Sequence, residues 1–194
     1  MLGTYTSLSE LEAVNLMLAT ISVAPVSTLG TSGDLNVSVA KQMLYDTSRE
    51  VQSYGYFFNM ERDYPLPRDL SNEITLPKNT LFLSLNDEFA PNERATLRGS
   101  KLYNIVKHNY KFDKDLKGTI TWFLTWEELP QPARQYIAIK AARKFQLRML
   151  PDDYTSKYSQ QEELEAKAQL EDYDAMTRQY NMADQSTVFK ILAR

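Results

Sequence analysis

The sequence contains no cysteine, and this absence excludes disulfides, thiolate metal sites and cysteine nucleophiles. It also suits a protein that is assembled in a reducing cytoplasm. No run approaches the roughly 18 apolar residues that a membrane-spanning helix needs, so we expect no membrane insertion. The opening residues, MLGTYTSLSELEAV, lack a basic stretch followed by an apolar core, and we expect no signal peptide.

Residues that carry enzyme chemistry are also scarce. His108 is the single histidine, so neither an HExxH zinc site nor a two-histidine relay can form, and no GxSxG elbow supplies a serine for a triad. The six glycines include no phosphate-binding loop. The carboxylate pairs Asp152–Asp153 and Glu162–Glu163 are sequence neighbours, whose side chains point in different directions. We therefore expect no enzyme, no cofactor and no catalytic, cofactor-binding or metal site.

The composition is that of an ordinary globular protein. The chain has 194 residues, of which 43% are hydrophobic and 24% charged, enough for one sizeable domain or a domain with an insertion. A formal net charge of −3 argues against a protein whose whole surface binds nucleic acid.

The first helix is predicted from a capping box and an apolar stripe. Ser7 and Glu10 have the spacing of the box. The helix is expected to end near Ala24, because Pro25 disfavours the helical conformation in the residue before it. The stripe that follows the box has helical spacing and comprises Leu8, Leu11, Val14, Leu18 and Ile21.

A second helix is predicted over about 35–53, with Asp34 as its cap and Gly55 after its end. The pattern then changes to short β-forming runs separated by turns, which implies an antiparallel sheet or a small barrel. The expected strands are YGYFFNM, EITLP, TLFLSL, KLYNIVKH and GTITWFLTW, and the expected loops are RDYPLPRD and NDEFAPNERATLRGS.

Helices return after Glu127. Pro130 and Pro132 stand at the entry of a helix that extends to about Leu150, and a last helix is predicted over about 155–182. The first of these helices is basic and the second is acidic, so opposite charges favour their antiparallel pairing, although two solvated faces would explain the same residues.

These elements predict an α+β fold, a four-helix bundle with an inserted antiparallel β-sheet or small barrel unit. The predicted organisation is helices one and two in 1–54, the β-unit in 55–126, helices three and four in 127–182 and a C-terminal tail in 183–194. The tail ends apolar and basic, beyond any helix that it could help to pack, so it is either frayed or bound to something else.

One stretch carries a resemblance to a known family. LSELEAVNLMLATISVAPVSTL, residues 8–29, resembles the amino-terminal signature of tail tubular protein A, the head–tail adaptor or gatekeeper family of short-tailed podophages. The signature residues are Ala13-Val14-Asn15, Leu18-Ala19-Thr20-Ile21 and Pro25-Val26-Ser27-Thr28-Leu29.

Two weaker matches follow in the order of the family pattern. VQSYGYFFNME, residues 51–61, is similar to the family's stretch at the junction of helix and sheet. ELPQPARQYIAIKAARKFQLRML, residues 128–150, is similar to its Leu-Pro entry and the helix that follows.

The resemblance implies a structural virion protein without enzyme activity. Members of this family form a dodecameric ring beneath the portal protein, bind the tail nozzle protein (tail tubular protein B), and help to seat the tail fibres. DNA passes through the central channel without sequence-specific binding, which agrees with an acidic chain. The expected location is the virion tail, after assembly in the host cytoplasm.

Two other classes of function stay open. A virion enzyme that cleaves cell-wall glycan needs only two carboxylates, and no pair is singled out. A nucleic-acid-binding module is suggested between Arg94 and Lys117, where seven basic residues face two acidic ones and aromatic residues are interleaved. We favour an exposed β-hairpin that touches a neighbouring subunit as the explanation of that stretch.

The candidate partner interface lies in the basic helix and the tail. The four apolar residues of the tail gain from a partner that covers them. The candidates are Arg134, Lys140, Arg143, Lys144, Arg148, Val188, Phe189, Lys190, Ile191, Leu192 and Arg194.

Overall fold

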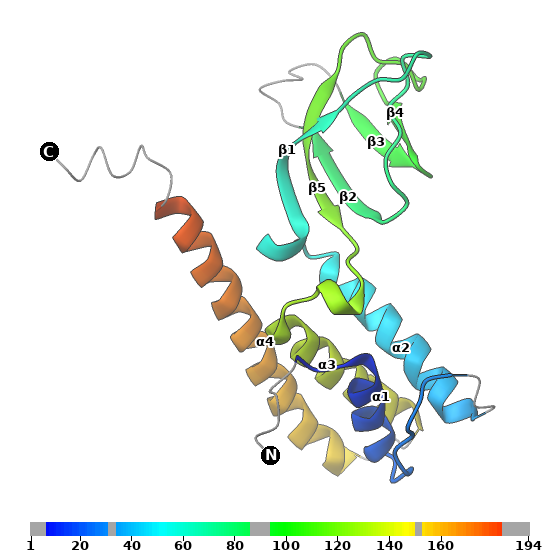
Figure 1. Cartoon of the computed structure of the whole chain (residues 1–194), viewed down its shortest axis with the longest axis vertical. Helices are drawn as coiled ribbons and strands as arrows, with labels where there is room; N and C mark the ends of the chain where they lie inside the picture. The colour runs from blue at the N-terminus through cyan, green and yellow to red at the C-terminus, as the bar shows by residue number, and fades with distance from the viewer. Residues whose placement is uncertain (1–6, 31–33, 86–93, 150–152, 184–194) are drawn as a thin grey trace, which may run out of the picture. The chain divides into compact units, whose positions relative to one another are not determined.

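The computed structural model describes residues 7–30, 34–85, 94–149 and 153–183, and within its last helix it describes the side chains of 160–179 (Figure 1).

The chain divides into two compact units. Residues 52–124 form one, which we call the β-unit. Residues 1–51 and 125–194 form the other, which we call the helical unit.

Helix α1 (Glu10–Ala19) begins at a capping box on Ser9, not at the predicted Ser7. The Glu12 amide donates to Ser9 Oγ at 3.2 Å and the Ser9 amide donates to Glu12 Oε2 at 2.8 Å. The later start leaves Leu8 outside the helix. There its amide donates to Gln131 Oε1 at 2.7 Å, and its carbonyl accepts from Trp126 Nε1 at 2.8 Å.

The predicted end of this helix, near Ala24, is wrong. The helix ends at Ala19, because Thr20 closes its last turn with a bond from its amide to the Met17 carbonyl at 3.1 Å. Ser22 then adopts a left-handed conformation with φ 58°, which turns the chain away before Pro25 is reached.

Asn15 explains the first family signature structurally. Its Nδ2 donates to the Val26 carbonyl at 3.0 Å, and its Oδ1 accepts from the Val26 amide at 2.8 Å. One side-chain amide thus satisfies both backbone groups of Val26 and ties the Pro-Val-Ser-Thr-Leu segment to α1. Three neighbours of Asn15, namely Ala13, Val14 and Leu18, are fully buried.

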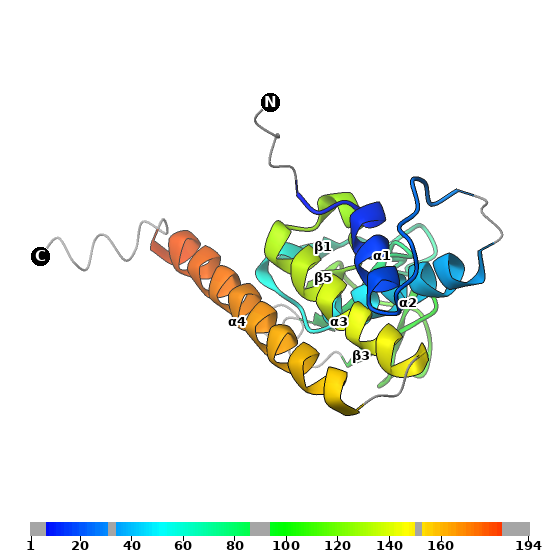
Figure 2. The ribbon, with the colours of Figure 1, turned by 90° about the horizontal axis from the view of Figure 1, so that it is seen from below.

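The other helices are α2 (Leu35–Gln52), α3 (Gln131–Met149) and α4 (Asp153–Ala183), each within a few residues of its prediction. The predicted cap of α2 is confirmed, because Asp34 Oδ1 accepts from the Asn36 amide at 2.9 Å. α3 packs against α1 and α4 (Figure 2). Tyr136, Ile137 and Phe145 of α3 are buried, whereas Met149 is 39% exposed.

The β-unit contains two small antiparallel sheets. Strands β1 (Met60–Leu66), β5 (Leu116–Trp122) and β2 (Thr80–Leu85) form one sheet in the order β1-β5-β2. Strands β3 (Ala95–Arg98) and β4 (Lys101–Asn104) form a hairpin whose turn places Gly99 at φ +64°.

Several strand predictions need correction. Only TLFLSL has its predicted bounds. EITLP makes isolated bridges, YGYFFNM holds a 3₁₀ turn before β1, and the strands predicted in KLYNIVKH and GTITWFLTW end at Asn104 and Trp122. Both expected loops contain strands, since RDYPLPRD carries most of β1 and NDEFAPNERATLRGS carries β3. Pro65 is tolerated in β1 because an edge strand leaves one row of amides without a ladder partner.

The core of the β-unit lies between the sheet and the hairpin. Leu66, Leu102, Phe112 and Ile120 are at most 2% exposed there. In the central strand, a Cβ on Gly118 would approach the Ser84 carbonyl oxygen to 2.7 Å, so only glycine allows β5 to lie this close to β2.

The described residues thus hold four α-helices and two antiparallel sheets, which confirms the α+β class. The two sheets do not close into the small barrel that was offered as an alternative. The arrangement of the helices as a four-helix bundle stays a prediction.

Candidate assembly surfaces

The candidate catalytic residues considered above that the structure describes lie apart or are bound to other groups. His108 is an exposed loop residue with φ 54°, in the turn after β4. Among the described residues, no group of three or more histidine, aspartate or glutamate side chains could hold a metal ion. Asp152 lies outside the described residues, and Glu163 is bound to Arg143 on a neighbouring helix while Glu162 is exposed.

No helix in the described part of the chain has the length and apolar character needed to cross a membrane.

Arg134 binds backbone carbonyls inside the helical unit. Its guanidinium donates to the carbonyls of Leu129 at 2.8 Å, Leu8 at 3.2 Å and Glu127 at 2.7 Å. The residue thereby joins the start of α3 to the segment before α1. This planar group with several donors suits three acceptors at once, which an ammonium of lysine could not reach with the same geometry.

Lys140 and Lys144 both bind Glu50 of α2. The Lys140 ammonium lies 3.1 Å from Glu50 Oε1, and Lys144 donates to Oε2 of the same carboxylate. The hydrogen bond from Lys144, followed by the contribution of Lys140, lowers the pKa of Glu50 against the opposing effect of burial. Burial is the largest single influence on Lys140 and would lower its pKa, but the hydrogen bonds and charge interactions with Glu50 and Tyr136 together outweigh burial, so the pKa is raised.

Arg143 joins α3 to α4, and Arg148 stands apart from the other basic residues. Arg143 donates to Glu163 Oε2 at 2.7 Å, which is the pairing of basic and acidic helix that the sequence favours. Arg148 lines a hollow of about 270 Å³ beside Met43 and Asp46 of α2. Four of the five basic residues proposed from the sequence therefore make contacts within their own unit.

The predicted interface in the tail falls outside the described residues. It comprises Val188, Phe189, Lys190, Ile191, Leu192 and Arg194.

The aromatic residues of the stretch from Arg94 to Lys117 contact other residues of the β-unit. Phe112 is 1% exposed and belongs to the core. Tyr103 and Tyr110 meet edge to face with ring centroids 5.1 Å apart, and the Arg98 guanidinium lies 3.5 Å from the centroid of the Tyr103 ring. These aromatic rings do not present the open stacking platform that single-stranded nucleic acid requires, so the structure disfavours that alternative.

A set of exposed residues gathers in the loops that flank β3 and β4. We call Arg94, Ile105, Val106, Lys107 and Lys111 the loop surface. The Ile105 amide donates to the Arg94 carbonyl at 2.7 Å, which brings Arg94 beside the segment that begins at Ile105. Ile105 is 43% and Val106 is 56% exposed, so apolar and basic groups alternate there.

Buried asparagine holds this loop in one conformation. Asn104 is fully buried, and its Oδ1 accepts from the Val106 amide at 3.0 Å and from the Lys107 amide at 2.9 Å. Asn109 Oδ1 accepts from the Lys111 amide at 2.9 Å. Side chains that replace backbone partners in this way fix a turn without regular secondary structure. These residues were not predicted from the sequence, although asparagine in a turn is a signal for such bonds.

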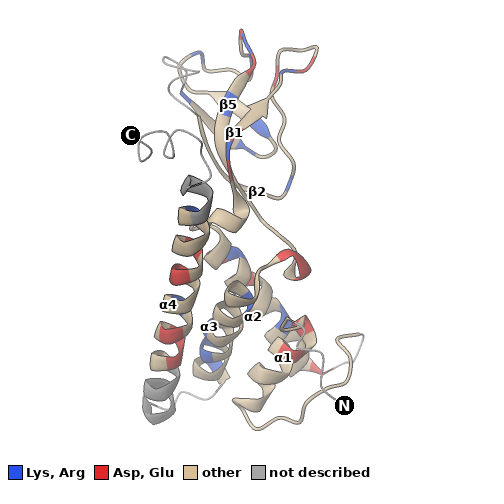
Figure 3. Cartoon of the chain, turned by 60° about the vertical axis from the view of Figure 1, so that its left-hand side comes forward, with Lys and Arg blue, Asp and Glu red and all other residues tan. Residues whose placement is uncertain are grey.

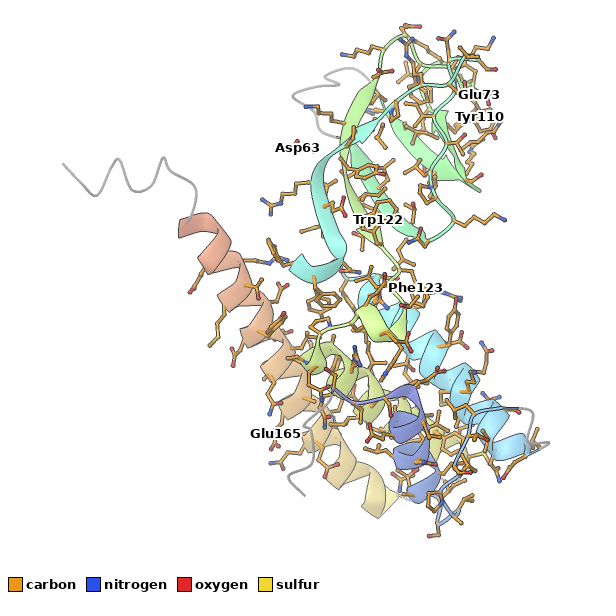
Figure 4. The ribbon with its side chains drawn as sticks, in the orientation of Figure 1. Asp63, Glu73, Tyr110, Trp122, Phe123 and Glu165 are labelled. Carbon is orange, nitrogen blue, oxygen red and sulfur yellow. The ribbon has the colours of Figure 1, made fainter. Side chains whose placement is uncertain are left out.

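Asn59 and Gln52 close the base of the β-unit, where Trp122 and Phe123 also lie (Figure 4). Asn59 Nδ2 donates to the carbonyls of Gln52 at 2.9 Å and Trp122 at 2.8 Å, and its Oδ1 accepts from the Tyr56 amide at 2.9 Å. The Gln52 side chain bonds both backbone groups of Leu124, at 3.1 and 2.7 Å. The first and last residues of this unit are thus joined.

This network explains the second family stretch. Gln52 and Asn59 are its two buried amides. Gly55, between them, adopts φ +75°, a conformation that glycine accepts without strain. The same stretch therefore ends α2, turns the chain and begins the sheet.

The described part of α4 is acidic. Residues 160–179 carry six carboxylates and two basic side chains, and Figure 3 shows acidic residues recurring along this helix. We call Leu164, Glu165, Ala168, Asp172 and Met176 the outer face of α4. All five are exposed, and Glu165 points away from α3 (Figure 4).

Comparison with known proteins gives this architecture a family. Residues 11–180 match the family described as Tube, tail tubular protein. The chain is also 28% identical over 130 residues to tail tubular protein A of Klebsiella phage KP34, an alignment that covers 66% of this chain and 67% of that protein. Because the family match spans most of the chain, this protein belongs to the tail tubular protein family and is a structural component of a phage tail.

Proposed function

We propose that this protein is a head–tail adaptor. In this proposal twelve copies form a ring beneath the portal protein, and the ring binds the nozzle protein (tail tubular protein B) and helps to seat the tail fibres. The observation that carries the proposal is the family match over residues 11–180, which includes both the helices and the β-unit. A structural role also agrees with the use of the signature residues, since Asn15, Gln52 and Asn59 bond the chain's own backbone.

DNA passes through the central channel in this proposal without sequence-specific contacts. A protein that binds the phosphate backbone of DNA needs many exposed basic groups directed at the phosphates. The formal net charge here is −3, and most basic residues of α3 are held by internal partners. A weakly acidic channel would let DNA slide.

The proposed contact with the portal or an adjacent subunit is made by the tail, 183–194, together with Arg148. Burying each of the four apolar side chains of the tail would contribute about 1.5–3 kcal/mol. Ordering the backbone opposes this by about 1–2 kcal/mol for each residue. The two contributions are comparable, so the tail needs a partner that supplies further contacts.

The decisive experiment is light scattering of the protein mixed with its portal protein. We expect about twelve copies to join each portal ring, as cyclic closure by a head-to-tail interface requires. The protein alone is the control, because the portal can serve as the template for the ring. A protein that stays monomeric in the mixture would contradict the proposal.

Two variants sharpen this test. Deleting 183–194 should leave the melting temperature almost unchanged and weaken portal binding, whereas equal binding by the truncated chain would remove the tail from the interface. His108→Ala should leave assembly intact.

A glycan-hydrolysis assay of the purified protein should show no turnover. Turnover that one carboxylate substitution abolishes would establish the enzyme alternative.

A further inference from the structure

We propose that the outer face of α4 in one copy binds the loop surface of the β-unit in a second copy. This inference rests on the proposed ring and assigns the two sides of its copy-to-copy interface. It begins with the length of α4, which has 31 residues and spans about 46 Å, whereas α3 has 19 residues and spans about 28 Å. α3 is too short to cover the whole of α4.

The burial of α4 agrees with this difference in length. Among its described side chains only Ala166 and Leu170 are buried. On the opposite side, Leu164 is 61% and Met176 is 60% exposed. A helix that buries so little of itself gains most of its stability from packing against something else, since isolated helices are marginal in water.

The six described carboxylates of α4 differ in exposure and pairing: Glu162 is exposed, and Glu171 is exposed and paired with Lys167 at 3.4 Å. Glu163 and Asp174 lie on the covered side and form ion pairs with Arg143 and Arg178. Glu165 and Asp172 belong to the outer face, and neither forms an ion pair with another described residue. The outer face therefore presents unneutralised negative charge beside exposed apolar groups.

The loop surface has the complementary composition. Arg94 and Lys111 are exposed and form no ion pair within the described part of the chain, whereas Lys107 of the same surface is paired with Asp113. Ile105 and Val106 supply exposed aliphatic groups next to them. The buried Asn104 holds their backbone, so little conformational freedom is lost when this surface binds.

A second copy fits these observations better than another partner does. Arg94 and Lys111 on the loop surface, and Glu165 and Asp172 on the outer face of α4, are exposed charges that form no ion pair among the described residues, so one chain carries both halves of an electrostatically complementary pair. Two different surfaces that bind each other give a heterologous interface, the type from which a ring is built when the rotation between copies closes. Nucleic acid would bind the loop surface alone and would leave the outer face of α4 uncovered.

Charge reversal tests the pairing. One double variant, Glu165→Lys with Asp172→Lys, reverses the charge of the outer face of α4, and another, Arg94→Glu with Lys111→Glu, reverses the charge of the loop surface. Each double variant should weaken association between copies by about tenfold or more, because it places like charges opposite one another. A chain with all four substitutions should associate as the parent does, and so should an equimolar mixture of the two double variants. Arg62→Glu with Lys78→Glu is the matched control, since it makes the same change of charge at exposed positions outside the loop surface.

Association is measured by light scattering with and without the portal protein. If the fourfold variant fails to recover while both double variants stay folded by circular dichroism, the proposed pairing is overturned. Rings that form normally from every variant also overturn it but leave the adaptor proposal standing. Loss of binding to single-stranded DNA on Arg94→Glu with Lys111→Glu, with unchanged association between copies, would assign the loop surface to nucleic acid instead.

The absence of cysteine allows a direct second readout. A Val106→Cys chain mixed with a Leu164→Cys chain should give a heterodimer with a short bis-maleimide. Leu35→Cys, at a residue that is 75% exposed on α2, replaces Val106→Cys in the control and should give none. Equal yields from the two mixtures would contradict the proposed contact.

Discussion

Replacing Asn59 with alanine should destabilise the β-unit more than any other exchange of a polar residue for alanine described here. The side chain is 1% exposed and makes three hydrogen bonds of 2.8–2.9 Å to backbone groups. Alanine leaves the Gln52 and Trp122 carbonyls and the Tyr56 amide without these partners.

The expected magnitude follows from the cost of a backbone group that loses its partner. A buried unsatisfied group costs about 1–3 kcal/mol. Gln52 is fully buried, whereas Tyr56 and Trp122 are partly exposed and can recover water. We therefore expect a total loss of about 3 kcal/mol, a large fraction of the roughly 5–15 kcal/mol that stabilises a domain.

Urea denaturation followed by tryptophan fluorescence measures this effect. The chain has two tryptophans, one in each unit, so a Trp126→Phe background lets Trp122 report on the β-unit alone. Asn79→Ala is the control, because Asn79 is exposed and donates one bond of 3.3 Å to the Phe123 carbonyl. It should cost less than about 1 kcal/mol. Equal losses for the two variants would refute the role assigned to the buried amide.

Three further predictions concern other parts of the chain. Asn15→Ala should cost about 1–2 kcal/mol in denaturant unfolding, because both backbone groups of Val26 lose their partner; a variant as stable as the parent would contradict this. Gly118→Ala should disturb the contact of β5 with β2, seen as faster amide exchange in both strands, since its Cβ would meet a carbonyl oxygen at 2.7 Å; unchanged exchange would show that the strands can separate freely. Because the pKa of Glu50 is lowered in the folded state, its carboxylate stabilises the fold at pH values above 4.5, the ordinary pKa of glutamate. This contribution is lost as the pH falls through the pKa of the folded state. Glu50→Gln should therefore flatten the decline of stability on acidification, and an unchanged decline would assign it to other carboxylates.

The sequence alone was enough to predict the four helices, apart from the start and end of α1, and the family. Local signals carry that information: Asp34 caps α2, the apolar stripe of α3 repeats every three or four residues, and the Ala-Val-Asn and Pro-Val-Ser-Thr-Leu segments stand at a spacing that the family shares. These signals depend on neighbours in the chain, so they can be read before any tertiary contact is known.

Tertiary structure decided which of several equivalent local signals is used. Ser7 and Ser9 both have a glutamate three residues later, and Ser9 became the cap because Leu8 is held outside the helix by Gln131 and Trp126. β1 and β3 were read as loops, since short strands with proline or charge at an edge lack an alternating apolar pattern.

The surfaces were decided in the same way. The basic residues of α3 have no acidic neighbour in sequence, which favours a partner interface, but Glu50 and Glu163 reach them from α2 and α4. A charge is available to a partner only when no distant residue of the same chain has already neutralised it. That condition is set by long-range packing, so it separates Lys144 from Lys111 although both are lysines in basic stretches.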